Sequence, residues 1–205
     1  MTTPYETEVK FYAPDLAAIQ QRLEAGGAVC TAPRVFERNV RYENERHNMS
    51  EKGLVLRLRQ DTRVRLTYKE PSEGKGDMSH RPEWEVEVSD FDTMETILSK
   101  LGYDSYMVYE KYRTTYTWND TEIVLDELPY GPFVEIEGEE EGIRAAIKAF
   151  DLGSLTPQPG SYVKLFERVQ RMLHLKFYNL TFKNFEGIDV PARIFSETPS
   201  EEDKA

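Results

Sequence analysis

Charged residues recur at every second position in most segments of this chain that alternate like β-strands. Successive side chains of a strand point to opposite faces of a sheet, so each such segment has one ionised face and one apolar face. Glu6, Glu8 and Lys10, for example, share a face, and Val9 and Phe11 lie opposite. The chain must therefore cover its apolar strand faces and, on the other side, accommodate a large set of charges.

These charges are sorted by strand. Acids occupy positions 6 and 8, 83, 85 and 87, and 135 and 137, whereas bases occupy 57 and 59, 65 and 69, and 111 and 113. An ordinary sheet with its charged face in water is one interpretation. Sorting by strand, however, places like charges side by side, which destabilises a sheet unless something binds between them. This pattern favours a closed antiparallel barrel with charged faces inward and apolar faces under helices.

Three segments repeat one supersecondary pattern, which suggests internal duplication. Residues 6–28, 83–104 and 133–154 each join a short strand containing Glu-x-Glu to an amphipathic helix and a glycine. Ser161 is a candidate N-cap of a further helix. The remaining alternating runs predict strands at 35–45, 54–60, 64–70, 108–118 and 121–128. The fold class is therefore α+β.

Length and composition limit the partners. With 205 residues we expect one domain, over residues 1–175, then an extension at 176–196 that packs on it and a disordered tail at 197–205. One cysteine excludes an intramolecular disulfide, and a net charge of −11 argues against nucleic-acid and anionic-membrane partners. The N-terminus lacks the pattern of a signal peptide, so we expect a cytoplasmic protein, either a monomer or a homodimer.

A tunnel that holds both signs of charge has a chemical interpretation. Clustered carboxylate oxygens suit Mg²⁺ or Mn²⁺. Several Arg and Lys side chains suit phosphate oxygens. The two together predict a site for a complex of a metal ion and a polyphosphate-bearing small molecule. No Gly-x-x-x-x-Gly-Lys-Ser/Thr run occurs, so the chain is not a P-loop enzyme.

The motifs resemble those of a known family. Glu6-Thr-Glu-Val-Lys10 is similar to the ExExK signature of the CYTH superfamily, the triphosphate tunnel metalloenzymes, which includes class IV adenylate cyclases and thiamine triphosphatases. It is followed in order by LRLR (Arg57, Arg59), TYK (Lys69), EWEVE (Glu85, Glu87), EKYR (Lys111, Arg113), VLDELPYGPFVEIEG (Asp126, Gly131, Glu135, Glu137) and SYVKL (Tyr162, Lys164). The resemblance implies an eight-stranded antiparallel tunnel flanked by helices.

The resemblance also implies roles for single residues. The expected metal ligands are Glu6 and Glu8 with Glu135 or Glu137, and Asp126 and Glu87 complete a second metal site. The expected triphosphate cradle consists of Lys10, Arg41, Arg57, Arg59, Lys69, Lys111, Arg113 and Lys164. Lys10 and Glu87 are the candidate catalytic residues, since a lysine or carboxylate at the tunnel end can position the attacking water.

Three functions remain open. The first is a metal-dependent triphosphatase acting on tripolyphosphate, thiamine triphosphate or a nucleoside triphosphate. The second is a class IV adenylate cyclase that converts ATP to cyclic AMP and pyrophosphate. Many bacterial proteins that resemble the cyclases carry a His-Phe pair ahead of ExExK, and this chain has only MTTPY there. The third is a non-catalytic polyphosphate-binding module, which would not need the carboxylates.

Overall fold

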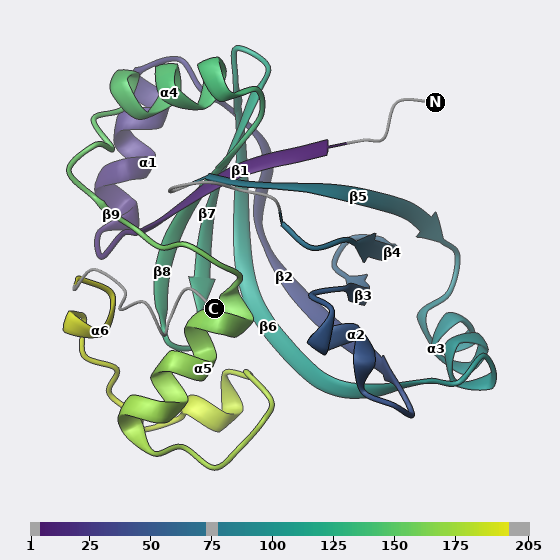
Figure 1. Cartoon of the computed structure of the whole chain (residues 1–205). Helices are drawn as coiled ribbons and strands as arrows, with labels where there is room; N and C mark the ends of the chain where they lie inside the picture. The colour runs from purple at the N-terminus through teal and green to yellow at the C-terminus, as the bar shows by residue number, and fades with distance from the viewer. Residues whose placement is uncertain (1–4, 73–77, 197–205) are drawn as a thin grey trace.

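Eight antiparallel strands form a closed barrel in the computed structural model, which describes residues 5–72 and 78–196 (Figure 1). The strands are β1 (Tyr5–Tyr12), β2 (Val29–Asn44), β3 (Val55–Gln60), β4 (Val64–Lys69), β5 (Met78–Val88), β6 (Tyr103–Trp118), β7 (Thr121–Leu128) and β8 (Gly131–Glu137). Their order is β5-β4-β3-β2-β6-β7-β8-β1, and β1 also pairs with β5. This last pairing closes the barrel and confirms the predicted tunnel. A two-residue strand, β9 (Thr156–Pro157), is added to β1.

The strand register determines which charges meet inside the barrel. In the β1–β8 pair Glu8 lies opposite Glu137, and Lys10 lies opposite Glu135. In the β6–β7 pair Arg113 lies opposite Asp126. Because residues opposite each other in a sheet share a face, the acidic and basic strands bring their charges into contact across strand boundaries.

Six helices and one short 3₁₀ turn flank the described barrel. They are α1 (Leu16–Ala25), α2 (Asn48–Glu51), α3 (Phe91–Lys100), α4 (Glu140–Ala149), α5 (Tyr162–Leu173), α6 (Arg193–Ser196) and η1 (Lys183–Phe185). Four of the helices match the predicted amphipathic segments, whereas the 3₁₀ turn and the two four-residue helices were not predicted. Each of α1, α3 and α4 follows the strand predicted for its unit. The Ser161 hydroxyl accepts a hydrogen bond from the Lys164 N–H and so caps α5. No helix in residues 5–72 or 78–196 is long and apolar enough to cross a membrane.

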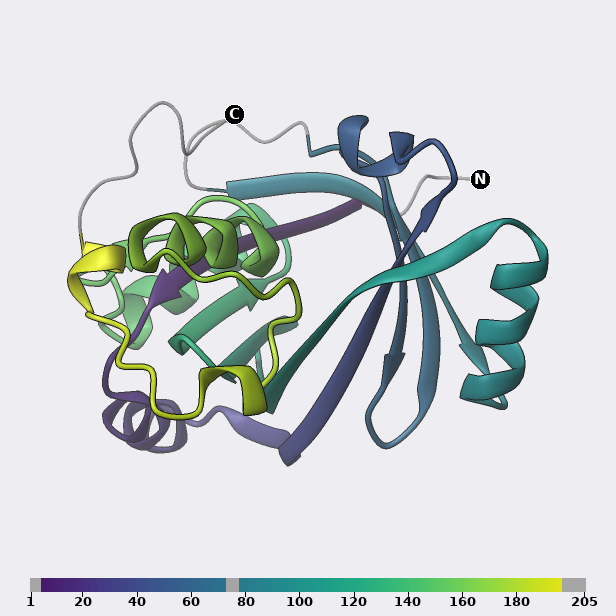
Figure 2. The ribbon, with the colours of Figure 1, turned by 90° about the horizontal axis from the view of Figure 1, so that it is seen from below.

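The apolar strand faces are buried in three clusters. Helices α1 and α4 lie together over one end of the barrel (Figure 1), where Leu23 and Ile143 pack with Ile136 of β8. Helix α3 lies apart from them (Figure 2), with Phe91 against Leu58 of β3. The third cluster lies between α5 and the strands β6 and β8. These apolar contacts turn the ionised faces inward.

Residues 176–196 lie against the barrel beside α5. Leu180 forms an isolated parallel bridge with Tyr109 of β6, and its N–H donates to the Val108 carbonyl over 2.9 Å. Phe195 of α6 is fully buried and stacks on Tyr12, with 4.8 Å between the ring centroids. This segment therefore shares the cluster of α5. The predicted tail at 197–205 lies outside the described residues.

Three strands begin earlier than the sequence predicts. Strand β2 begins at Val29 instead of residue 35, β5 at Met78 and β6 at Tyr103. In β2 the ladder is irregular between Cys30 and Ala32 and between Ala32 and Val35. Pro33 lies within the second irregularity. Proline removes a ladder hydrogen bond and is found in strands at bulges, which explains why alternation failed to reveal this part of the strand.

Candidate active site

The barrel encloses a charged cavity of about 1040 Å³. Eleven Lys and Arg residues and nine Asp and Glu residues line it. The chain as a whole carries a net charge of −11, so its basic residues are concentrated inside the barrel. A cavity with this balance attracts an anion in spite of the acidic exterior.

The structure brings most of the predicted site residues to this cavity. The lining includes Lys10, Arg41, Arg57, Arg59, Lys69, Lys111 and Arg113 of the predicted cradle and Glu6, Glu8, Glu135 and Glu137 of the predicted metal site. Three predicted residues are not part of the lining. Asp126 is fully buried in the wall, Glu87 is 61% exposed and pairs with Arg63 at the rim, and Lys164 is exposed on α5.

The carboxylates of the cavity are engaged with one another. Glu8 hydrogen-bonds Glu135, and Glu6 takes hydrogen bonds from Glu83 and Glu137. Burial, reinforced by the Glu135 charge, raises the pKa of Glu8 to about 7. Burial and the Glu6 charge raise the pKa of Glu137 to about 8. Each pair of carboxylates therefore shares a proton near neutral pH.

Glu6 and Glu83 divide a proton in the same way. Burial and the hydrogen bond to Glu6 raise the pKa of Glu83 to about 7. Burial would also raise the pKa of Glu6, but the hydrogen bond from Glu83 and the charge of Lys69 lower it to about 2. Glu6 is therefore ionised at neutral pH. Glu135 is ionised too, since burial would raise its pKa but the charges of Lys10 and Arg113 lower it well below its ordinary value. Together with Glu8, Glu83 and Glu137 these two form the acidic group.

This acidic group fits a divalent cation by its donor chemistry. Its donors are carboxylate oxygens alone, the ligand type that Mg²⁺ and Mn²⁺ prefer, and no His or Cys is among the residues that line the cavity. A divalent cation would replace the protons that now separate the carboxylates. Within residues 5–72 and 78–196 no three acidic or histidine side chains form a ready-made metal-binding group, because the carboxylates are paired with one another and with cations.

Asp126 has a different environment from the acidic group. Its Oδ1 accepts a hydrogen bond from Arg113 Nε at 2.7 Å, and its Oδ2 accepts from Arg113 Nη2 at 2.6 Å. Lys111 Nζ at 3.0 Å and the Tyr162 hydroxyl at 2.7 Å also donate to Oδ2. Both oxygens are therefore occupied, and Asp126 organises two cations of the tunnel wall.

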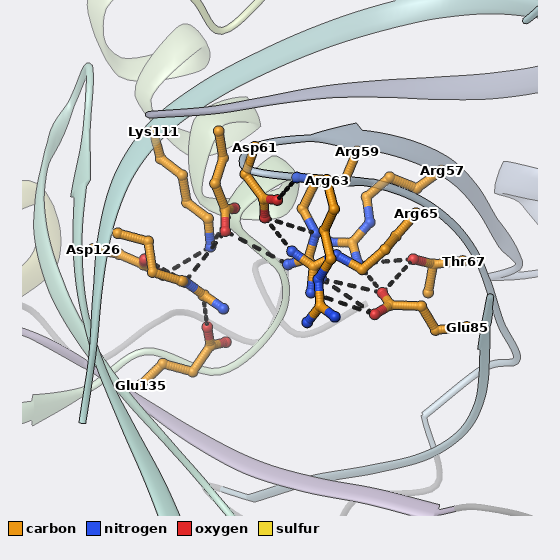
Figure 3. Close-up of polar contacts among 12 residues, drawn as sticks. Arg57, Arg59, Asp61, Arg63, Arg65, Thr67, Glu85, Lys111, Asp126 and Glu135 are labelled. Atoms are coloured by element: carbon orange, nitrogen blue, oxygen red, sulfur yellow. Dashed lines mark hydrogen bonds and ion pairs between the residues drawn. The ribbon is translucent and has the colours of Figure 1, made fainter. Parts of the chain in front are cut away.

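The arginines opposite form a second network (Figure 3). Arg59 lies between two carboxylates, with Glu85 at 3.1 Å and Glu37 at 3.6 Å. Arg57 donates to the Tyr109 hydroxyl at 3.2 Å and to the Thr67 hydroxyl at 3.0 Å. Figure 3 places this group across the cavity from Lys111, Asp126 and Glu135. The wall thus holds the guanidinium groups in fixed orientations.

The two lysines of β1 and β4 keep their charge. Lys10 Nζ lies 2.9 Å from Glu135 and 4.4 Å from the centre of the Tyr162 ring. Burial alone would lower the pKa of Lys10, but the charges of Glu135 and Glu8 raise it. Lys69 Nζ lies 2.7 Å from Glu6 and also contacts Glu83. Both lysines are therefore cations and donors at neutral pH, not bases.

Several buried N–H groups of the cavity have no hydrogen-bond partner among the described residues. They are Nε of Arg41, Arg57, Arg59 and Arg65, and both Nε and Nη2 of Arg81. A buried donor left unsatisfied costs about 1–3 kcal/mol. So many of them around one cavity indicate a ligand rich in acceptor oxygens, and phosphate groups match this demand.

Sequence reasoning missed several residues of the site, among them Glu37, Arg65, Arg81 and Glu83. Glu37 is buried between Lys111, Arg113 and Arg59. Glu37, Asn39 and Arg41 alternate along the predicted strand at 35–45 and so share a face. Because Arg41 belongs to the predicted cradle, this alternation could have placed Glu37 in the site. Arg81 belongs to the part of β5 that precedes the predicted Glu-x-Glu strand. Glu83 was placed on the charged face but not assigned to the site.

Comparisons with known proteins agree with this geometry. The family model described as CYTH domain matches residues 4–164, and no curated protein matches the chain. A candidate adenylate cyclase from Vibrio parahaemolyticus superimposes with a TM-score of 0.69 at 17% identity, over 81% of this chain and 99% of that one. A protein from Pyrococcus horikoshii gives a TM-score of 0.62 at 27% identity, over 79% and 98%.

A third solved structure links the fold to a reaction in another protein. A candidate adenylyl cyclase from Hippeastrum, described as having a dominant triphosphatase activity, superimposes with a TM-score of 0.61 at 17% identity, over 79% of this chain and 95% of that one. These likenesses confirm the tunnel fold. The residues that line the cavity must supply the rest of the argument.

Proposed function

The chain belongs to the CYTH domain family, and from this membership and the chemistry of its cavity we propose that it is a divalent-metal-dependent triphosphatase. The proposed substrates are tripolyphosphate, thiamine triphosphate or a nucleoside triphosphate. The observation that carries the proposal is the set of buried arginine N–H groups without partners on five arginines of one cavity. A chain of three phosphoryl groups offers enough non-bridging oxygens to satisfy them together, and a single phosphate does not.

The acidic group supplies the metal site of the proposal. Glu6, Glu8, Glu135 and Glu137 would hold Mg²⁺ or Mn²⁺. When bound, the ion neutralises charge on the phosphate chain and on the oxygens of the reacting phosphoryl group. Asp126 is left out of this ligand set because it is fully buried in the wall and does not line the cavity, where Lys111, Arg113 and Tyr162 donate to its oxygens.

The basic residues bind and orient the phosphate chain. Arg57 and Arg59 are held by Thr67, Tyr109, Glu37 and Glu85, so their remaining N–H groups are aimed before the substrate enters. Lys10 stays protonated and can donate to a phosphoryl oxygen as negative charge develops on it. Phosphoryl transfer depends mainly on such positioning and electrostatic stabilisation. In the proposed reaction the basic wall holds the phosphate chain for in-line attack by water.

The test is an incubation of the purified protein with Mg²⁺ or Mn²⁺ and, separately, tripolyphosphate, thiamine triphosphate, ATP and GTP, followed by chromatography of the products. We expect orthophosphate as the first product and tripolyphosphate to be at least as good a substrate as ATP. The reason is that the partner-free donors of the cavity suit phosphate oxygens, and no comparable set for reading adenine is evident. The matched control is the same reaction in EDTA.

Two other outcomes would replace the proposal. Cyclic AMP with stoichiometric pyrophosphate, and no hydrolysis of tripolyphosphate, would assign the chain as a class IV adenylate cyclase. Tight binding of tripolyphosphate without turnover under any metal would assign it as a polyphosphate-binding module.

A further inference from the structure

We propose that one edge of the Arg81 guanidinium is a two-point docking site for a phosphoryl group of the bound substrate. The inference rests on the proposed function of the tunnel. Arg81 lies on β5, opposite Glu6 in the β1–β5 register, and it lines the cavity. It is absent from the motifs that identified the site by sequence.

The unsatisfied atoms of Arg81 distinguish it from the other arginines of the cavity. Its Nε and Nη2 are both buried and have no hydrogen-bond partner among the described residues. These two nitrogens project their hydrogens in parallel from one edge of the guanidinium plane. In Arg41, Arg57, Arg59 and Arg65, only Nε is both buried and without a partner. Arg81 is thus the one arginine of the described lining in which two buried donors of the same edge lack a partner.

Two other arginines of the same cavity show what this edge binds when it is filled. Arg113 places Nε 2.7 Å from Oδ1 and Nη2 2.6 Å from Oδ2 of Asp126. Arg34 places Nε 2.7 Å from Oε1 and Nη2 3.0 Å from Oε2 of Glu127. In both cases two oxygens of one anionic group take the two donors. The unpartnered edge of Arg81 consists of the same two donors, Nε and Nη2. It can therefore bind a ligand whose two oxygens are spaced like those of a carboxylate.

The surroundings select a phosphoryl group as that ligand. A phosphoryl group within a polyphosphate has two non-bridging oxygens, which match the two donors. Glu6, opposite Arg81, belongs to the carboxylates proposed to hold the metal, so the docked group would lie next to that site. Lys69 of the neighbouring strand β4 and Arg57 of β3 line the same cavity and can neutralise the remaining charge of the polyphosphate.

Arg81→Lys tests the two-point contact because lysine keeps the positive charge and lacks the planar edge. Tripolyphosphate binding is measured by calorimetry in EDTA, so that turnover does not interfere. We expect the dissociation constant to rise about 10- to 100-fold, the equivalent of one charge-assisted hydrogen bond. The matched control is Arg144→Lys, which lies outside the cavity on α4 and whose Nε and Nη2 both donate to Glu140, and this variant should bind tripolyphosphate like the wild type.

The outcomes separate this inference from the proposed function. Wild-type affinity in folded Arg81→Lys would overturn the inference and leave the triphosphatase proposal intact, whereas a wild-type protein that binds no tripolyphosphate would end both. Equal affinity of the wild type for orthophosphate and tripolyphosphate, with both lost in Arg81→Lys, would make the site one for free phosphate and overturn the substrate assignment.

A measurement on the wild-type protein covers the case in which the variant does not fold. The Nε–H resonance of Arg81, assigned through its own backbone amide, should shift and become protected from exchange with water when tripolyphosphate is added. The Nε–H of Arg144, which donates to Glu140 outside the cavity, should not change. An unchanged Arg81 resonance at saturating tripolyphosphate would overturn the inference.

Discussion

Some residues of the tunnel stabilise the fold and others are proposed to bind the ligand. Asp126 belongs to the first kind. It is fully buried and accepts hydrogen bonds from Arg113, Lys111 and Tyr162. Removing one member of a buried charge network leaves the others uncompensated. We therefore expect Asp126→Asn to lower the free energy of unfolding by about 3–5 kcal/mol in metal-free buffer, as measured by urea denaturation.

The control for this change is Glu127→Gln, one residue along the strand. Glu127 pairs with Arg34 at the surface, where an ion pair contributes about 0–1 kcal/mol. If Asp126→Asn were as stable as Glu127→Gln and lost only metal affinity, Asp126 would be a metal ligand, as the sequence predicted.

Glu8 is a residue of the opposite kind, because its charge is costly in the absence of a ligand. Burial and the Glu135 charge raise its pKa, and in the metal-free protein it donates a hydrogen bond to Glu135. The amide of a glutamine can replace that donor without adding charge. We expect Glu8→Gln to retain or raise the melting temperature in EDTA and to lose most metal-dependent turnover of tripolyphosphate.

Glu141→Gln provides the charge-matched comparison, since Glu141 is exposed in the first turn of α4. It should leave turnover unchanged. Full Mg²⁺-dependent activity in Glu8→Gln would remove Glu8 from the metal site.

At the scale of elements, α6 closes the apolar cluster behind the tunnel. Phe195 packs edge-on against Phe133 of β8, and its carbonyl accepts a hydrogen bond from Gln158 Nε2 at 2.6 Å. The Gln158 backbone N–H in turn donates to the Lys10 carbonyl at 2.8 Å. We expect Phe195→Ala to reduce the free energy of unfolding by about 3–5 kcal/mol, measured by urea denaturation.

Tyr178 offers an aromatic control in the same segment. Its side chain is 81% exposed, so Tyr178→Ala should change stability by less than about 0.5 kcal/mol. Equal, small effects of both substitutions would mean that residues 176–196 are not coupled to the folding of the barrel.

The strands show how much of the fold and of the site can be predicted from the sequence. Alternation predicted the tunnel and its charged wall, because the two-residue period of a strand fixes which side chains share a face. It could not tell how far along a strand the cavity extends, and so Glu87 falls at the rim while Glu83, four residues earlier, lies inside. Nor could it tell which strands far apart in the sequence lie side by side, such as β2 and β6, whose pairing places Glu37 opposite Lys111.

For the whole molecule, the shared protons of the acidic group make stability depend on pH. The pKa values of Glu8, Glu83 and Glu137 are raised from 4.5 to about 7, 7 and 8. The stability that these groups contribute is complete below pH 4.5 and is lost as the pH rises through their folded pKa values. We expect the melting temperature in EDTA to fall between about pH 5 and pH 8.5.

A divalent ion should reverse this trend, because it takes the place of the protons. The difference in melting temperature between Mg²⁺ and EDTA should therefore widen as the pH rises, and Glu137→Gln should flatten the decline in EDTA. A melting temperature in EDTA that climbs steadily to pH 8.5 would contradict the proton-sharing arrangement. Glu6, whose pKa is lowered to about 2, adds an opposite loss only in acid.

The closure of the barrel by β1 also has a consequence for folding during synthesis. Strand β1 is synthesised before the other strands of the barrel. Its partners β5 and β8 end at Val88 and Glu137, so both of its edges can be paired only after residue 137 has been added. An unpaired strand is a template for aggregation, and charged side chains are the usual protection against it. Glu6, Glu8 and Lys10 provide that protection. The charges that line the cavity in the folded protein can thus also protect the nascent strand from aggregation.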